Sequence, residues 1–343
     1  MKSIWQCPSG QPFILAGSGT LAMDTAAANL VEPGDKALVI STGYFGDRFA
    51  EILKRYGADV TMLKSATGGV IDPDAIESEL RRTKYKVLTF THVDTSTAVL
   101  VDPVPIGLLG KKYGVLTILD GVCSVAGEEI RQEEWGIDVV LTASQKAVGV
   151  PPGLALLVVS PEAIDKWKSR TTLVGSYYSD WSNWLPIMNA YANRKPSYFG
   201  TPAVNLVAAL EVSLQLILRE GLDVRFERHK RTGDAFRAGI AALGLDQVPV
   251  NNQVAANTLS APMYPDGISG PEFLSSVSSQ GVILAGGLLP EIKDKYFRIG
   301  HMGSVNKGDI ITTLSAIESG LKHCGYPVVT GASINAALNI LNI

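Results

Sequence analysis

Short apolar runs alternate with amphipathic stretches through the first half of the chain. The runs are rich in Val, Ile and Leu, which is typical of strands buried on both faces of a sheet. The stretches between them predict helices, two of which begin at the Asp-Pro pairs of Asp72 and Asp102, a strong helix-start signal. The predicted strands cover residues 12–16, 36–41, 58–64, 86–93, 115–120, 137–143 and 154–160.

This alternation predicts an α/β fold, in which helices cover both faces of a mainly parallel, mixed sheet. The carboxyl ends of parallel strands meet at one edge of such a sheet, and ligands bind beyond that edge. Phe45, the polar segment 92–97, Asp120 and Lys146 all follow predicted strands. We therefore expect the functional site at this edge.

The second half of the chain has a different pattern. Residues 161–202 are rich in aromatic residues without a regular period, so we expect an irregular connection there. Two long helical patterns follow from about residue 204, then strand-like runs and a last helix over about 307–322. We predict a large domain over 1–203, a smaller α+β C-terminal domain over 204–326 and a tail over 327–343 without a recognisable motif.

Composition narrows the class of protein. With 343 residues, of which 46% are hydrophobic and 18% charged, the chain can bury a substantial core. The net charge is −3, and the sequence contains no long run of charges of one sign, so we expect no nucleic-acid and no membrane partner. No apolar run is long enough to span a bilayer, and the three scattered cysteines indicate a reducing compartment. We expect a cytoplasmic location by default, with a mitochondrial or peroxisomal one left open.

Lys146 occupies an unusual position for a lysine. It follows the apolar run 139–142 and lies among small residues, before a stiff turn over 149–153 that contains two prolines. A lysine at the end of a buried strand can lose its proton and attack an aldehyde. The alternative is an ordinary solvated lysine, since lysines are seldom buried.

A Gly-Ser-Gly-Thr turn at residues 17–20 precedes an Ala-rich helix. Its backbone N–H groups, its hydroxyls and the positive end of the helix dipole suit a phosphate group. Similar turns are also common without a ligand. The turn is not a Walker loop, because no Gly-Lys-Ser/Thr follows, and it matches the dinucleotide fingerprint poorly.

In their order and spacing these motifs resemble those of the fold-type I pyridoxal-phosphate enzymes. The segments AGSGT, THVDTSTAVL, LDGVCS, EEWGIDVVLTASQKA, PPG, YFGTP and FRIGHMG are more closely similar to the alanine–glyoxylate and serine–pyruvate aminotransferases, in their fungal branch. The resemblance runs from about Gln11 to about Cys324. It implies pyridoxal 5′-phosphate as the cofactor, amino acids and 2-oxo acids as substrates, and a homodimer.

The resemblance also implies roles for individual residues. Lys146 matches the lysine that holds the cofactor as a Schiff base, and Asp120 matches the carboxylate that pairs with the pyridine nitrogen. Phe45 matches an aromatic residue, often Trp, stacked on the ring, and Thr95 matches a hydroxyl residue at the ring's 3-oxygen. Arg298 matches the arginine that binds the substrate carboxylate. Plainer alternatives are a cap for Asp120, a strand-end hydroxyl for Thr95 and a surface arginine for Arg298.

A further set of residues matches the phosphate site of the family. Within the chain these are the turn residues and a neighbouring glutamine, and two more residues would reach in from the other subunit of the dimer. The set consists of Ser18, Gly19, Thr20 and Gln145, with Tyr198 and Thr201 from the partner.

The activity implied by the resemblance is ping-pong transamination from L-alanine to glyoxylate, giving pyruvate and glycine. The alternatives are serine–pyruvate or serine–glyoxylate exchange, or another fold-type I reaction. Members of the family usually begin some tens of residues earlier, with a Pro-Gly-Pro turn near the substrate and an arm on the partner subunit. We therefore expect a short form or a truncated chain, and a homologue of low activity is a further alternative.

Overall fold

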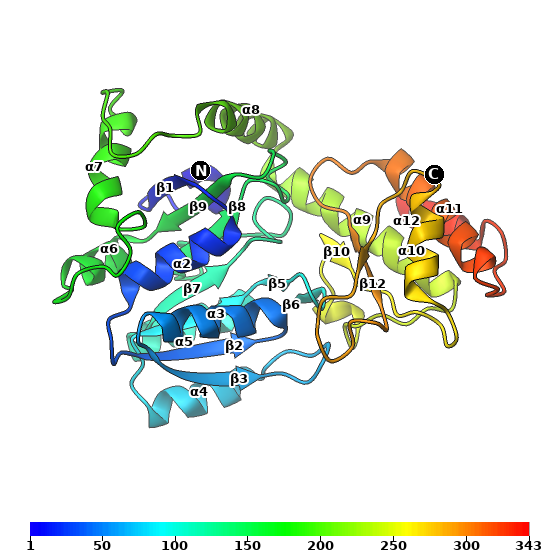
Figure 1. Cartoon of the computed structure of the whole chain (residues 1–343), viewed down its shortest axis with the longest axis horizontal. Coiled ribbons are helices and arrows are strands. Elements are labelled where there is room, and N and C mark those ends of the chain that lie inside the picture. Colours follow the sequence, from blue (N-terminus) through cyan, green and yellow to red (C-terminus); the bar gives the residue numbers. More distant parts are fainter. Residues whose placement is uncertain (343) are drawn as a thin grey trace.

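The computed structural model describes residues 1–342. A large sheet with helices on both sides lies beside a smaller part formed by the C-terminal third of the chain (Figure 1). The large sheet has the strand order β1-β9-β8-β7-β4-β2-β3. Its strands are β1 (Gln11–Ala16), β2 (Lys36–Ser41), β3 (Asp59–Lys64), β4 (Val87–Thr91), β7 (Leu116–Asp120), β8 (Val139–Ala143) and β9 (Leu154–Val159).

The five strands from β3 to β8 are parallel, whereas β9 is antiparallel to β8 and β1 is antiparallel to β9. The predicted mainly parallel, mixed sheet is therefore confirmed. The carboxyl ends of β2, β4, β7 and β8 lie at one edge, as expected from their direction. A small hairpin of β5 (Val93–Asp94) and β6 (Val99–Leu100) follows β4 at this edge.

Two hydrophobic clusters cover the two faces of the sheet. Alternate residues of one strand divide between them, so that Leu38 and Ile40 belong to one cluster and Val39 to the other. The first face packs against α1 (Lys2–Trp5), α4 (Pro73–Arg82), α5 (Pro103–Tyr113) and α8 (Val204–Glu220). The second face packs against α2 (Gly19–Leu30), α3 (Tyr44–Arg55), α6 (Pro161–Lys168) and α7 (Trp181–Ala192).

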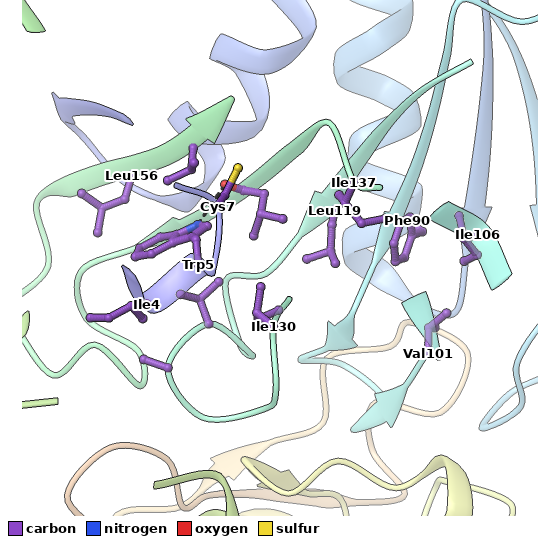
Figure 2. Packing of buried hydrophobic residues seen from close by; sticks show 14 of the residues in the cluster. Ile4, Trp5, Cys7, Phe90, Val101, Ile106, Leu119, Ile130, Ile137 and Leu156 are labelled. Carbon is purple, nitrogen blue, oxygen red and sulfur yellow. Dashed lines mark hydrogen bonds between the residues drawn. The ribbon is translucent and has the colours of Figure 1, made fainter. Parts of the chain in front are cut away.

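The first face buries the beginning of the chain. Figure 2 shows Ile4 and Trp5 of α1 beside Leu156 of β9. The indole nitrogen of Trp5 donates to the Val140 carbonyl at 3.2 Å, so the one polar atom of this buried ring has a partner. The N-terminal turn is thus part of the core.

The predicted irregular connection over 161–202 is wrong, because the structure has two helices there. Ser160 accepts a hydrogen bond from the Ala163 N–H at the start of α6, and Asp180 accepts one from Ser182 at the start of α7. The aromatic residues are partly core residues of α7, since Trp181 and Trp184 are buried. These aromatic residues made the helical period hard to recognise in the sequence, although the two capping residues could have indicated where the helices begin.

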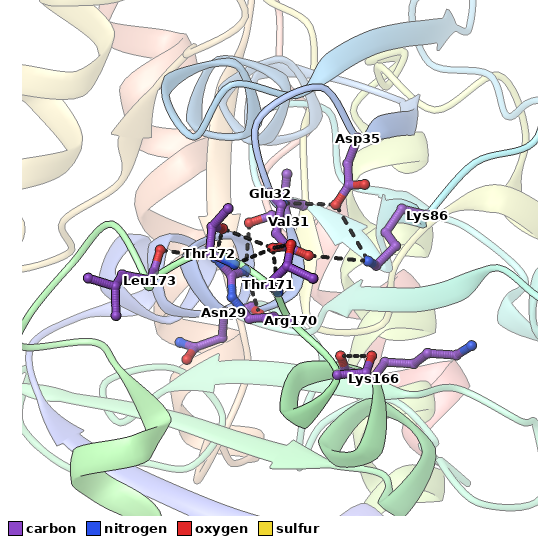
Figure 3. Close-up of polar contacts among 11 residues, drawn as sticks. Asn29, Val31, Glu32, Asp35, Lys86, Lys166, Arg170, Thr171, Thr172 and Leu173 are labelled. Carbon is purple, nitrogen blue, oxygen red and sulfur yellow. Dashed lines mark hydrogen bonds and ion pairs between the residues drawn. The ribbon is translucent and has the colours of Figure 1, made fainter.

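A polar cluster fastens the segment after α6 to the end of α2 (Figure 3). The Glu32 carboxylate accepts hydrogen bonds from the backbone N–H groups and hydroxyls of Thr171 and Thr172, at 2.8–3.1 Å. Arg170 donates to two carbonyl groups at the C-terminal end of α2. This network positions the chain between α6 and α7.

The C-terminal part has a core of its own. A three-stranded antiparallel sheet, β10 (Leu259–Ser260), β12 (Phe297–Gly300) and β11 (Ala285–Gly286), lies with α9 (Leu222–Ala242), α10 (Gly270–Ser278), α11 (Lys307–His323) and α12 (Ala332–Leu341). The predicted tail therefore contains a helix, α12, which packs on α9. The domain boundary at 203/204 stays a prediction, and α8 buries Leu210 and Ile217 in the core of the large sheet.

Within residues 1–342, no helix has both the length and the apolar character that crossing a bilayer requires.

Candidate active site

A cavity of about 200 Å³ lies at the carboxyl edge of the large sheet. It brings together most of the residues that the sequence predicted for the site. These are Ser18, Gly19, Thr20, Phe45, Thr95, Asp120, Gln145 and Lys146, and they share the wall with Met23, Arg48, Val93 and Val122. Their convergence follows from the parallel strands that precede most of them.

Lys146 lies in a loop that is closed by its own hydrogen bonds. The Ser144 hydroxyl donates to the Pro151 carbonyl at 2.8 Å and accepts from the Leu154 N–H at 3.2 Å. The Gly149 N–H donates to the Lys146 carbonyl at 2.8 Å, and Gly149 has a φ of 77°, which favours glycine. The loop therefore presents the lysine side chain from a fixed backbone.

A buried arginine that the sequence analysis missed braces this loop. Arg225 of α9 donates to the carbonyl groups of Ala147 at 2.7 Å and Ala126 at 2.6 Å, and it pairs with Glu220 at 2.7 Å. Arg225 is separated from Lys146 by a long stretch of sequence, so no local pattern could have indicated this contact. It ties the C-terminal part to the lysine loop.

Asp120 ends β7 and is only 2% exposed. Its carboxylate accepts the Val122 N–H at 3.0 Å and lies 3.5 Å from the Thr91 hydroxyl. Among residues 1–342, no lysine or arginine forms an ion pair with it. Burial raises the pKa of Asp120 to about 7. A buried carboxylate of this kind fits a ligand that brings an N–H donor or a positive charge, such as a protonated pyridine nitrogen.

Phe45 lies in the first turn of α3, and a distant carboxylate caps this helix. Asp94, which is fully buried, accepts hydrogen bonds from the backbone N–H groups of Phe45 at 3.0 Å and Gly46 at 3.4 Å. A Cβ atom on Gly43 would lie 2.4 Å from the Ser96 hydroxyl and 2.7 Å from the Asp94 carboxyl carbon. The close approach that sets Phe45 on the cavity wall therefore requires glycine at position 43.

The predicted phosphate turn is the first turn of α2. Ser18 is the N-cap residue, but its side chain does not cap the helix. The first N–H groups of a helix have no partner within the helix, so they can donate to a ligand. A Cβ atom on Gly19 would lie 2.7 Å from Val122, and the glycine therefore lets the turn lie close to β7. These residues fit an anionic group.

Thr95 and Arg298 are linked at the edge of the cavity. Arg298 of β12 donates from Nη1 to the Thr95 carbonyl at 3.2 Å and from Nε to the Gly286 carbonyl at 2.8 Å. The Thr95 hydroxyl lies 2.7 Å from the Cys123 sulfur, a buried thiol that the sequence analysis did not place in the site. Arg298 does not line the small cavity, but it contacts a residue that does.

Tyr198 and Thr201 lie apart from the cavity of their own chain. They occupy the exposed segment between α7 and α8, where their hydroxyl groups are 3.5 Å apart, and Tyr198 is 73% exposed. Their predicted role belongs to the partner subunit of a dimer and stays a prediction.

A larger cavity, of about 640 Å³, lies between α5 and α9 and is lined by residues such as Trp135 and Phe226. None of the predicted site residues lines it. The smaller cavity is the candidate active site because it contains the converging lysine, carboxylate and polar turn.

Known proteins with similar sequences and structures indicate the family to which the chain belongs. The family model described as "Aminotransferase class-V" matches residues 3–289. Alanine–glyoxylate aminotransferase 1 of Saccharomyces cerevisiae is 40% identical over 305 residues, which are 85% of this chain and 78% of that protein. Serine–glyoxylate aminotransferase of Arabidopsis thaliana is 32% identical over 347 residues, with 99% and 85% covered.

Among solved structures, pyridoxamine–pyruvate aminotransferase from Mesorhizobium loti superposes with a TM-score of 0.93 at 30% sequence identity, over 99% of this chain and 86% of that chain. The sheet and the second part therefore belong to a known fold, that of the fold-type I enzymes. The chain is a member of the class-V aminotransferase family, whose cofactor is pyridoxal 5′-phosphate.

Proposed function

We propose that this protein transfers the amino group of L-alanine to glyoxylate, giving pyruvate and glycine. The observation that carries the proposal is the cavity at the sheet edge, which combines Lys146, Asp120 and Phe45 with the first turn of α2. The similarity to an alanine–glyoxylate aminotransferase, at 40% identity, supports this substrate pair over others.

The cavity residues divide according to the parts of the cofactor. Lys146 would hold the aldehyde carbon, Asp120 the ring nitrogen, Phe45 one ring face and Thr95 the ring's 3-oxygen. Ser18, Gly19 and Thr20 would bind the phosphate group, with Gln145 beside them. When bound, pyridoxal phosphate supplies an electron-accepting ring that stabilises negative charge at the substrate Cα.

The residues of the chain then have separate tasks. Asp120 keeps a proton on the ring nitrogen, because its negative charge favours the protonated, positively charged form of that nitrogen. The positive charge in turn offsets the cost of burying the carboxylate. The Lys146 amine, released when the substrate amine takes its place at the aldehyde carbon, would take the proton from the substrate Cα as the base and return it to the aldehyde carbon as the acid.

Arg298 orients the substrate by its carboxylate, through the parallel N–H donors of the guanidinium group. Its bonds to the Thr95 and Gly286 carbonyls fix the plane of that group. The chain thus supplies both a reacting amine and a fixed carboxylate receptor.

Serine is the second candidate amino donor, since a serine–glyoxylate aminotransferase is 32% identical to the chain. A homodimer, in which Tyr198 and Thr201 reach the neighbouring phosphate site, is part of the proposal. The cytoplasmic location stays a prediction.

A comparison of the two amino donors in separate reactions tests the substrate pair. The protein, saturated with pyridoxal phosphate, receives glyoxylate with either L-alanine or L-serine, and the glycine formed is measured over time. We expect a higher kcat/KM with alanine, and no glycine from the Lys146→Ala variant. Glycine formation from serine but not from alanine would overturn the proposed donor and leave the aminotransferase assignment standing.

A further inference from the structure

Arg48 lies on the cavity wall, although the sequence analysis did not include it in the site. It is three residues after Phe45 in α3, so the two side chains lie on the same face of the helix. The guanidinium carbon is 4.8 Å from the centre of the Phe45 ring and 5.0 Å from that of Tyr44. Contacts of this kind attract a cation to an aromatic face and so orient the guanidinium group.

Most of the hydrogen-bond donors of Arg48 have no protein acceptor within residues 1–342. Nη1 donates to the Thr20 hydroxyl at 3.1 Å, and Nη2 lies 3.4 Å from the Tyr44 hydroxyl. A guanidinium group carries five N–H donors, so at least half of them stay available.

Among residues 1–342, no carboxylate forms an ion pair with Arg48. The neighbouring Asp47 is engaged elsewhere, by the Ser41 hydroxyl at 2.6 Å and by Lys64 Nζ at 2.8 Å. Arg48 is half-buried, so its charge is not fully solvated. A partly desolvated cation on a cavity wall, with free donors and without an ion-pair partner among the described residues, favours an anionic ligand. The Asp120 carboxylate on the same wall acts on Arg48 through its charge but forms no hydrogen bond with it.

The charges around the cavity indicate which anionic group this is. Lys146 and Arg48 are the cationic side chains on the described wall, and Lys146 is assigned to the aldehyde carbon. A phosphate ester carries close to two negative charges at neutral pH. The N-terminus of a helix supplies only about half a positive charge, so the first turn of α2 leaves most of this charge without compensation.

Thr20 connects the two features. It belongs to the predicted phosphate turn, and its hydroxyl accepts the hydrogen bond from Arg48. We propose that Arg48 binds the phosphate group of the cofactor from the same chain, and that the Tyr44 and Phe45 rings orient it for this contact. One turn of α3 then contacts both ends of the cofactor, the ring through Phe45 and the phosphate through Arg48.

This inference rests on the cofactor of the family and not on the alanine–glyoxylate pair, so the two proposals can fail separately. The test compares two ligands that differ only in the phosphate group. The cofactor-free protein is titrated with pyridoxal 5′-phosphate and with pyridoxal in a phosphate-free buffer, and Kd is measured by quenching of tryptophan fluorescence. The variants are Arg48→Gln and Arg48→Lys, and Arg55→Gln is the matched control, because it removes the same charge from an exposed site on the same helix.

We expect Arg48→Gln to weaken the binding of pyridoxal phosphate by about 10- to 100-fold, the range of a hydrogen bond to a charged group. Its affinity for pyridoxal should stay within about threefold of the parent value, and Arg55→Gln should change neither affinity by more than that factor. Inorganic phosphate should compete with pyridoxal phosphate in the parent protein and less so in Arg48→Gln.

Equal losses for both ligands would show that Arg48 acts through the packing of Phe45 and would overturn the proposal. An unchanged affinity for pyridoxal phosphate would overturn it as well. If Arg48→Gln does not fold, as judged by its thermal unfolding, the Arg48→Lys variant decides by the same comparison. It keeps the charge but loses the fork of donors, so a selective loss for the phosphorylated ligand supports the contact and an equal loss refutes it.

Discussion

Replacing Asp120 with asparagine should stabilise the cofactor-free protein and weaken its binding of the cofactor. The carboxylate is 2% exposed and has no ion-pair partner among residues 1–342. Burial raises the pKa of Asp120 from 3.8 to about 7, so the charged form is unfavourable in the folded protein. Asparagine has a similar shape and keeps an oxygen atom for the Val122 N–H, but it has no charge to desolvate.

The size of the gain and its pH dependence follow from this difference in pKa. A carboxyl group with a raised pKa in the folded state lowers stability once the pH exceeds its unfolded value, and the cost grows until the pH passes the folded value. With values of 3.8 and about 7, the window runs from about pH 4 to pH 7. At about 1.4 kcal/mol for each pKa unit, the cost above this window is at most ~4 kcal/mol. Asp120→Asn should therefore equal the parent near pH 4 and exceed it by up to this amount at pH 8.

Urea unfolding of the cofactor-free protein at pH 4, 6 and 8 measures this difference. Asp138→Asn is the matched control, because Asp138 is also 2% exposed but is paired with Lys111 at 2.8 Å and accepts the Thr117 N–H at 2.9 Å. Removing its charge should destabilise the protein. If Asp120→Asn had the stability of the parent at pH 8 while Asp138→Asn was destabilised, burial of the Asp120 carboxylate would carry no cost in the folded protein. Asp120→Asn should also bind pyridoxal phosphate about 10- to 100-fold more weakly.

Three further predictions concern the polar cluster at Glu32, the aromatic residue of the cavity and the cap of α3. Burial opposes the ionisation of Glu32, but hydrogen bonds from Thr171 and Thr172 hold its pKa at about 2. Its contribution is therefore present above about pH 5 and lost as the pH falls towards 2, and Glu32→Gln should cost about 1–3 kcal/mol at pH 7 and little at pH 2, as measured by urea unfolding. Phe45→Ala should weaken cofactor binding by at least about threefold through the lost stacking, and an unchanged Kd in a fluorescence titration would contradict this. Asp94→Asn should speed hydrogen exchange of the first amides of α3, and unchanged protection would argue against the cap.

The residues at strand ends could be predicted from the sequence, because their placement depends on local pattern and sheet direction alone. Asp120 and Lys146 follow apolar runs, and parallel strands bring such ends together. The antiparallel direction of β9 was also accessible. The connection from β8, residues 144–153, is shorter than a crossover between parallel strands requires.

The supports of the site could not be predicted in the same way. Asp94 caps α3 from 49 positions away, and Arg225 contacts the lysine loop across 78 positions, so both contacts exist only in the folded chain. Arg48 is an intermediate case. Its spacing from Phe45 was visible in the sequence, but its free donors and its contact with Thr20 were not.

The central claim is tested most directly by the absorption spectrum of the protein loaded with pyridoxal phosphate. We predict a visible band that moves to the near-ultraviolet when L-alanine is added, returns when glyoxylate is added, and is absent from Lys146→Ala. A visible band that ignores alanine but responds to serine would contradict the substrate pair. A protein that forms no such band with saturating pyridoxal phosphate would contradict the assignment of Lys146 and the account of the cavity as the active site.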